Sequence, residues 1–173
     1  MALETADRSW FEPMIGRFER RAFRYALMLT LNRSAAEDLV QEAFERLWAA
    51  QNTPSVELGF KRWLFRTITN LARDRHRRRL VESAVRLMVP APLNPEDEII
   101  RKAGDRKLVA ALQSLKLRDR QAIYLRYYQE ESFAQIAEIL HVKEGTARVI
   151  VNRALEKLRQ RLNPSADITE VMA

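Results

Sequence analysis

Apolar residues recur every three or four positions through most of this 173-residue chain, which is the spacing of one face of an α-helix. In the first half the spacing defines three stripes: Phe18, Ala22, Tyr25 and Leu29, then Leu39, Ala43 and Leu47, then Leu64, Ile68 and Leu71. Ser34 followed by Glu37 indicates a capping box at the start of the second helix. Four shorter helical segments follow from about Asp105, and no stretch alternates as a strand would. The pattern predicts an all-α fold.

The helical pattern breaks once over a long segment. Pro90, Pro92 and Pro95 lie within six residues, and three acids follow at 96–98. No apolar stripe crosses this segment, so we predict a flexible linker at residues 80–104. Two small helical domains are then expected, at residues 1–79 and 105–173. The apolar linker residues 87–89 are candidates for docking on a partner.

Composition narrows the classes of function. The formal charge of +7 favours a polyanionic partner, either nucleic acid or an anionic membrane surface. There is no cysteine, and the two histidines stand far apart, so no metal or other cofactor is predicted. The N-terminus does not resemble a signal peptide and no run approaches ~20 apolar residues, so we expect a soluble, cytoplasmic chain without membrane insertion. No nucleophile–base–acid set or Gly-rich phosphate loop indicates an enzyme.

Residues 132–162 carry the most informative pattern. A short helix opened by a Ser132–Gln135 capping box is followed by the turn 141–143 and a longer helix. This is the helix-turn-helix arrangement, whose second helix enters the major groove by its N-terminal end. The candidate DNA contacts are Lys143, Glu144, Thr146, Arg148, Val149, Asn152 and Arg153. The alternative is a plain antiparallel helical hairpin.

The helix around residues 39–48 has an unusually acidic outer face. Asp38, Gln41, Glu42 and Glu45 recur at three- and four-residue spacing in an otherwise basic chain. We interpret them as a docking surface for a basic protein, with Leu39, Phe44, Leu47 and Trp48 holding the helix in place. A solvated face is the simpler alternative.

The helix from about Phe60 to Arg79 is basic instead. Arg62, Arg66, Arg73 and Arg77 fall close to one stripe, with Lys61, Arg75, Arg78 and Arg79 nearby. Such a strip suits phosphates. Trp63 and Asn70 lie one position off the stripe and could handle unpaired bases, where stacking contributes roughly 1–3 kcal/mol per base. Trp63 as a core residue and Asn70 as a surface amide are the alternatives.

These three motifs, in this order, closely resemble the extracytoplasmic-function sigma factors. Residues 37–44 with Leu47-Trp48 resemble the family's core-polymerase-binding helix, and residues 63–74 with the following arginines resemble its minus-ten-element helix. Residues 120–128, 132–140 and 145–158 resemble its minus-thirty-five-element domain. The resemblance spans about residues 10–79 and 100–162.

The resemblance implies a set of partners. The acidic face would bind the clamp coiled coil of bacterial core RNA polymerase, and the loop 51–59 would receive an unstacked base of promoter DNA. The linker would thread toward the active-site and RNA-exit channel, and an anti-sigma factor is expected to hold the free protein. Val149, Ile150 and Asn152 depart from the family pattern, as does His141 where a turn glycine is frequent. These departures put the minus-thirty-five sequence in doubt.

Two other binding functions stay open. A stand-alone helix-turn-helix regulator would need a dimerisation surface and a palindromic site, and it leaves the acidic helix unexplained. A sigma-like mimic that titrates an anti-sigma factor would bind DNA weakly, as the departures at 149–152 allow.

Overall fold

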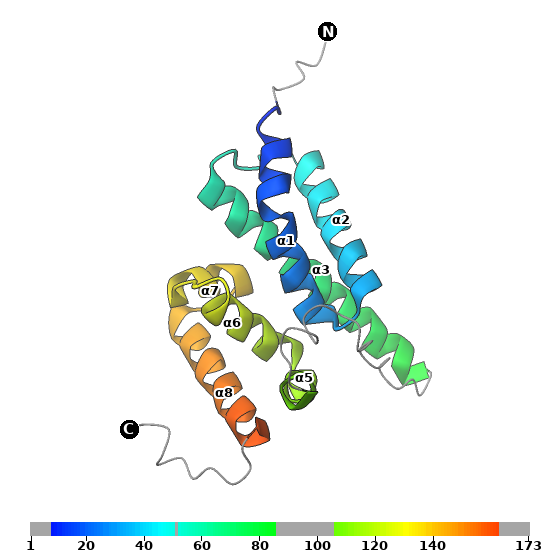
Figure 1. Cartoon of the computed structure of the whole chain (residues 1–173), viewed down its shortest axis with the longest axis vertical. Coiled ribbons are helices and arrows are strands. Elements are labelled where there is room, and N and C mark those ends of the chain that lie inside the picture. The colour runs from blue at the N-terminus through cyan, green and yellow to red at the C-terminus, as the bar shows by residue number, and fades with distance from the viewer. Residues whose placement is uncertain (1–7, 51, 86–105, 163–173) are drawn as a thin grey trace. The chain divides into compact units, whose positions relative to one another are not determined.

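The computed structural model describes residues 8–50, 52–85 and 106–162, and every regular element in these ranges is an α-helix, which confirms the predicted fold class (Figure 1). The chain divides into two compact units, residues 1–90 (unit 1) and 91–173 (unit 2). Most of the predicted linker, including residues 87–89, lies outside the described ranges.

The described residues of unit 1 form three helices, α1 (Phe11–Thr30), α2 (Arg33–Ala49) and α3 (Glu57–Val85), each packed against the other two. The three stripes expected from the sequence are buried and form the core. Burying a Leu or Phe side chain contributes about 1.5–3 kcal/mol, so this shared interior holds the bundle together. Inside it, the Tyr25 hydroxyl lies 2.8 Å from the Thr69 hydroxyl and ties α1 to α3.

The junction between α1 and α2 differs from the prediction. Leu31 adopts a left-handed conformation (φ 54°) that ends α1, and its backbone N–H donates to the Leu27 carbonyl. Asn32 then caps α2, because its side-chain oxygen accepts the Ala35 N–H at 2.9 Å. The predicted capping box at Ser34 and Glu37 is therefore wrong, since Ser34 already lies inside the first turn.

The connection between α2 and α3 is shorter than expected. α3 begins at Glu57 instead of near Phe60, and it continues to Val85, beyond Arg79. Its first turn packs against the loop, where a Cβ added to Gly59 would lie only 2.8 Å from the Cβ of Pro54. The Thr53 hydroxyl donates to the Leu47 carbonyl at 2.5 Å and fastens the other end of the loop to α2.

Trp48 does not hold α2 in the core as predicted, because its side chain is 50% exposed. Its ring makes an edge contact with Phe11 at 5.0 Å and lies under the guanidinium of Arg8, also at 5.0 Å. Arg8 in addition donates a hydrogen bond to the Trp48 carbonyl. The ring thus covers the end of the bundle.

Unit 2 contains α5 (Arg106–Ser114), α6 (Leu117–Tyr127), α7 (Phe133–Leu140) and α8 (Glu144–Leu162). α8 packs against the other three through Ala147, Val151, Ala154 and Leu158, all buried. The Lys157 ammonium also reaches the Asp119 carboxylate on α6 at 2.5 Å. The four helical segments expected after residue 105 are thus confirmed.

Candidate protein and nucleic-acid interfaces

The four predicted docking residues of α2 divide into three exposed side chains and one that is bound by arginines of unit 1. Asp38, Gln41 and Glu45 are exposed, and the Gln41 amide donates to the Glu45 carboxylate at 2.9 Å along the helix surface. A pair of this kind leaves both groups open to a partner. Three of the four predicted docking residues are thus displayed together on α2.

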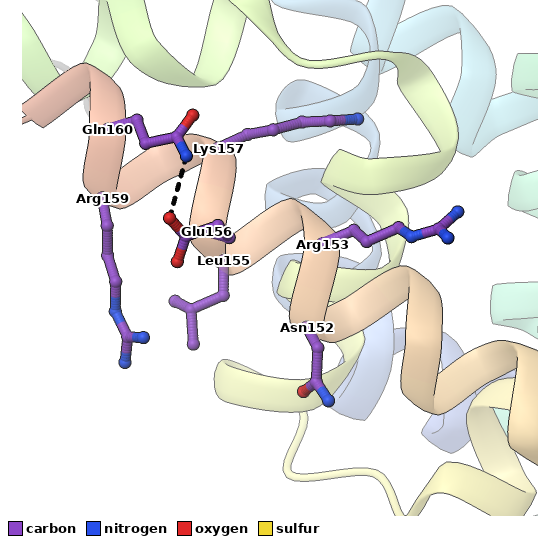
Figure 2. A pocket seen from close by; sticks show the side chains of 7 residues that line it. All are labelled: Asn152, Arg153, Leu155, Glu156, Lys157, Arg159 and Gln160. Atoms are coloured by element: carbon purple, nitrogen blue, oxygen red, sulfur yellow. Dashed lines mark hydrogen bonds between the residues drawn. The ribbon is translucent and has the colours of Figure 1, made fainter. Parts of the chain in front are cut away.

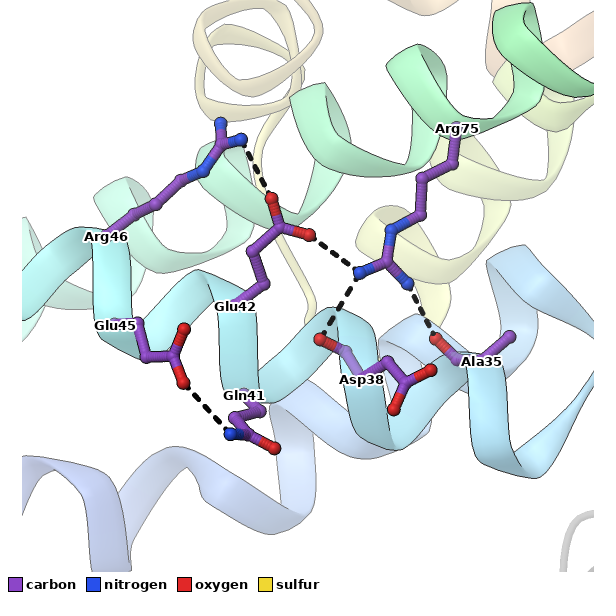
Figure 3. Close-up of polar contacts among 7 residues, drawn as sticks. All are labelled: Ala35, Asp38, Gln41, Glu42, Glu45, Arg46 and Arg75. Atoms are coloured by element: carbon purple, nitrogen blue, oxygen red, sulfur yellow. Dashed lines mark hydrogen bonds and ion pairs between the residues drawn. The ribbon is translucent and has the colours of Figure 1, made fainter.

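Glu42 is the exception, because two arginines bind it (Figure 3). One carboxylate oxygen accepts from Arg75 of α3 at 2.6 Å, and the other accepts from Arg46 of α2 at 2.8 Å. The hydrogen bond from Arg75 is the main reason that the pKa of Glu42 is lowered, against a smaller opposing effect of burial. Glu42 therefore stays ionised at neutral pH, with its charge largely met within unit 1.

Arg75 acts as a tie between two helices. Besides Glu42, it donates to the backbone carbonyls of Ala35 at 3.3 Å and Asp38 at 3.4 Å (Figure 3). We expected Arg75 to add to the basic strip of α3, and this expectation is wrong because the side chain turns toward α2. Its position nine residues after Arg66 lies well off the arginine stripe of the helix, so the spacing could have indicated this.

The other arginines of α3 remain available at the surface. Arg66, Arg73 and Arg77 are exposed and Arg62 is half-buried. Arg77 pairs with Asp74 at 3.4 Å, but the side chains are 80% and 50% exposed, so the pair is weak. We call Arg62, Arg66, Arg73 and Arg77 the α3 row. The row can take phosphates along about four turns of helix.

Trp63 and Asn70, the residues considered for unpaired bases, are both half-buried. Each has one surface toward the interior and one toward solvent, so neither the core nor the fully exposed alternative describes them. The adjacent loop and the first turn of α3 add exposed apolar groups, since Val56 is 71% exposed and Leu58 is 50% exposed. Exposed apolar side chains beside a cationic row are suited to base faces. Gln51 of this loop lies outside the described residues.

The helix-turn-helix forms as predicted in unit 2. Ser132 and Gln135 make both hydrogen bonds of the capping box, at 3.2 Å and 2.8 Å, and α7 starts there. His141 occupies the left-handed region at φ 54°, where a side chain is rarely accepted, and the N–H of Val142 bonds to the Ala137 carbonyl at 3.0 Å. Ile136, Leu140 and Val151 fill the wedge between α7 and α8.

All seven predicted contact residues of α8 and its approach are exposed: Lys143, Glu144, Thr146, Arg148, Val149, Asn152 and Arg153. Arg148 is folded back onto its own unit. Its guanidinium lies 4.5 Å from the ring centre of Phe133 and 3.7 Å from the Glu144 carboxylate. Arg126 approaches the same ring at 4.9 Å. Arg148 must leave Glu144 to reach a base edge.

The described part of unit 2 also contains one shallow surface depression. A depression on α8 is lined by Asn152, Arg153, Leu155, Glu156, Lys157, Arg159 and Gln160 (Figure 2). These side chains all come from one helix, so the depression is open. Within the described ranges, no group of three His, Cys, Asp or Glu side chains could hold a metal ion. No helix in those ranges is both long and apolar enough to span a bilayer.

Comparison with known proteins follows the same division of the chain. Residues 14–81 match the family described as Sigma-70 region 2, and residues 111–160 match Sigma-70, region 4. The chain is 34% identical over 143 residues to the ECF RNA polymerase sigma factor SigL of Mycobacterium tuberculosis, covering 79% of this chain and 80% of SigL. It is 25% identical over 173 residues to SigW of Bacillus subtilis, covering 92% of each. A chain of the co-crystal structure of the sigma factor RpoE with the anti-sigma factor NepR from Bartonella quintana matches with a TM-score of 0.70 and 26% identity, over 90% of this chain and 98% of that chain.

Proposed function

Because this chain belongs to the ECF RNA polymerase sigma factors, we propose that it binds core RNA polymerase and directs promoter recognition, DNA opening and the start of transcription. The protein itself performs no covalent chemistry in this proposal. It works in the cytoplasm, and its partners are core polymerase, promoter DNA and an anti-sigma factor. The anti-sigma partner is supported by the matched RpoE, which was crystallised with NepR.

Unit 1 would make the contact with polymerase through α2. Asp38, Gln41 and Glu45 present acceptors to solvent, and a basic helical surface such as the clamp coiled coil complements them. Glu42 would contribute through its remaining exposed area while Arg75 fixes its position. Since exposed charges mainly set association rate and orientation, charge reversal there should weaken docking without unfolding the bundle.

Unit 1 would also open and hold the minus-ten element. The α3 row supplies phosphate contacts, and Trp63, Asn70 and the loop ending at Val56 supply groups suited to unstacked bases. Unit 2 would read the minus-thirty-five duplex with α8, where Lys143 and Arg153 suit phosphates and Arg148 suits a base edge or phosphate. In domain terms the proposal keeps 1–79 for polymerase and minus-ten binding and 105–173 for minus-thirty-five binding. The linker predicted at 80–104 overlaps the end of α3, which runs to Val85.

The observation that carries this proposal is the presence of opposite interfaces in one chain. An acidic helix face and a basic row occupy unit 1, and an exposed recognition helix occupies unit 2. A stand-alone regulator needs only the last of these. An initiation factor needs all three, because it must hold polymerase while it reads and opens DNA.

The test is capture of bacterial core RNA polymerase by the purified protein, followed by transcription from a pool of random promoter fragments. Binding and transcription of a subset of fragments are expected, and the enriched fragments give the promoter elements. Duplex binding without polymerase binding would identify a stand-alone regulator instead. Binding to neither would contradict the proposal and favour the mimic.

A further inference from the structure

Four exposed arginines form a second basic row in unit 1. They are Arg17, Arg20, Arg21 and Arg24 of α1, and their spacing of three and four residues places them on one flank of the helix. The two acids of α1, Glu12 and Glu19, fall on the other flank. We call these arginines the α1 row. It concentrates positive charge that no role described so far uses.

The contacts of the α1 row show which residues are committed within the protein. Arg17 forms an ion pair with Glu57 in the first turn of α3, and Arg21 lies 5.9 Å from the ring centre of Phe18. Arg20 and Arg24 form no ion pair with any residue in the ranges 8–50, 52–85 and 106–162. Their guanidiniums are therefore available to an anion from outside.

The α1 row runs alongside α3. Phe18 contacts Phe60, and Tyr25 contacts Phe65 and Thr69 further along, so α1 and α3 run in the same direction. The Arg17–Glu57 pair joins the start of the row to the start of α3. The α1 row therefore lies alongside about residues 57–69 of α3, a stretch that includes Arg62 and Arg66 of the α3 row.

Both rows lie on the same face of unit 1. On α3, Phe65 and Thr69 face α1. Counted round the helix from Thr69 in the direction away from α2, Arg62, Arg73 and Arg66 follow at about 20°, 40° and 60°. On α1, Arg21, Arg17 and Arg24 follow Tyr25 at about 40°, 80° and 100° round the helix. Arg20 lies further round, at about 140°, on the outer side of α1. The two rows therefore flank the junction of α1 and α3 on the side opposite α2. The acidic residues of α2 are therefore not on this face.

A nucleic-acid backbone fits this arrangement. Arg20 and Arg24 are about 6 Å apart along the axis, a length that about two phosphates of one stacked strand occupy. Guanidinium groups bind phosphate with paired N–H donors, and each neutralised phosphate releases counterions. An acidic protein would also be attracted. The shared face with the α3 row favours DNA, because one strand can pass between the two rows.

We propose that the α1 row is a second phosphate-binding site, and that it grips the backbone of the promoter strand held by the α3 row. Arg20 and Arg24 make the contacts, and Arg17 and Arg21 add to the local positive potential. This assignment rests on the proposed function, since it takes promoter DNA as the ligand of unit 1. The contact is independent of base sequence because it involves phosphates alone.

The test uses holoenzyme assembled from core polymerase and the full chain, with a promoter fragment recovered from the transcription pool and unpaired at its minus-ten element. Binding is measured against salt for the parent and for Arg20→Ala/Arg24→Ala. Loss of two phosphate contacts should lower the slope of log affinity on log salt by about 1.4 and weaken binding on the order of tenfold near 0.15 M salt. Arg20→Lys/Arg24→Lys keeps the charges and should retain most of the affinity.

A matched control removes the same charge elsewhere. Arg159 and Arg161 are exposed in the last turn of α8, and Arg159→Ala/Arg161→Ala should leave the slope unchanged. The assignment would be overturned if the α1 variant kept the parent's slope of log affinity on log salt. It would also be overturned if the variant bound core polymerase more weakly while its binding to DNA was unchanged. If the parent fails to bind core polymerase, the proposed function fails separately. The salt slope of the full chain on a single-stranded oligonucleotide then decides the α1 row by the same criterion.

Discussion

Replacing Arg75 by alanine is expected to destabilise unit 1, because this side chain joins α3 to α2. Its strongest contact is the 2.6 Å hydrogen bond to Glu42, and the two carbonyl contacts at 3.3 and 3.4 Å are longer and weaker. A hydrogen bond to a charged group contributes about 1.5–3 kcal/mol. The Arg75 and Glu42 side chains are 30% and 33% exposed, so solvent screening reduces the expected loss to about 1–2 kcal/mol.

The assay is urea or thermal unfolding of the full chain followed by tryptophan fluorescence. Trp10, Trp48 and Trp63 are the only tryptophans and all belong to unit 1, so the signal reports this unit alone. A loss of 1.5 kcal/mol corresponds to about 6–12 °C in Tm for a domain of this size. Arg66→Ala, at an exposed position of the same helix, should change stability by less than about 0.5 kcal/mol. Equal effects of the two variants would refute the role given to Arg75.

The pH dependence of the same contact provides a second measurement. The folded-state pKa of Glu42 lies below its ordinary value of 4.5, mainly because of Arg75. The carboxylate therefore stabilises unit 1 fully above about pH 4.5, and this stabilisation is lost as the pH falls through the lowered pKa. Glu42→Gln should be less stable than the parent at neutral pH, and the difference should shrink in acid. A constant difference down to strongly acidic pH would contradict this origin.

Three further changes test other parts of the structure. Gly59→Ala should lower the stability of unit 1 by about 1 kcal/mol, because the added Cβ would meet Pro54 and this outweighs the helix propensity of alanine. A rise in the Tm followed by tryptophan fluorescence would be inconsistent with this. Glu130→Gly should raise the stability of unit 2 by about 0.5 kcal/mol, since Glu130 is held at φ 55°; calorimetry of the unit 2 transition measures it, and a decrease would count against the explanation. Arg148→Ala should weaken binding to the upstream duplex by about 1 kcal/mol or more, and unchanged affinity and promoter choice would remove it from the readout residues.

The cores of both units could be predicted from the sequence because helical periodicity reports burial directly. Phe18, Leu39 and Ile68 belong to expected stripes and are fully buried. The Ser132–Gln135 capping box could also be predicted, since the two residues are consistent with only one starting position for the helix. At the start of α2, by contrast, Asn32 and Ser34 are both good capping residues. The left-handed conformation of Leu31 determines which of the two is the N-cap, and the local sequence does not predict that conformation.

The candidate interfaces were predictable only in part, because spacing gives the side of a helix but not the partners of a long side chain. Glu42 and Arg75 both carry charges typical of surface residues, yet they are 33 positions apart in sequence and form a contact between α2 and α3. Trp48 is an apolar residue expected to hold α2 in place, but it lies at the end of the bundle, where half of its surface stays exposed. The position of the α1 row beside the α3 row depends on the parallel packing of α1 and α3, which helical spacing alone does not give.

The most direct test of the whole account is the affinity of the full chain for core RNA polymerase when the exposed acids of α2 are reversed. Asp38→Lys/Glu45→Lys is compared with Glu12→Lys/Glu19→Lys, which makes the same charge change at exposed positions of α1. The parent and the α1 variant are expected to bind alike, and the α2 variant is expected to lose at least about tenfold in affinity, or 1.4 kcal/mol. Equal binding by all three proteins, or none by the parent, would contradict the proposal that α2 docks this chain on polymerase.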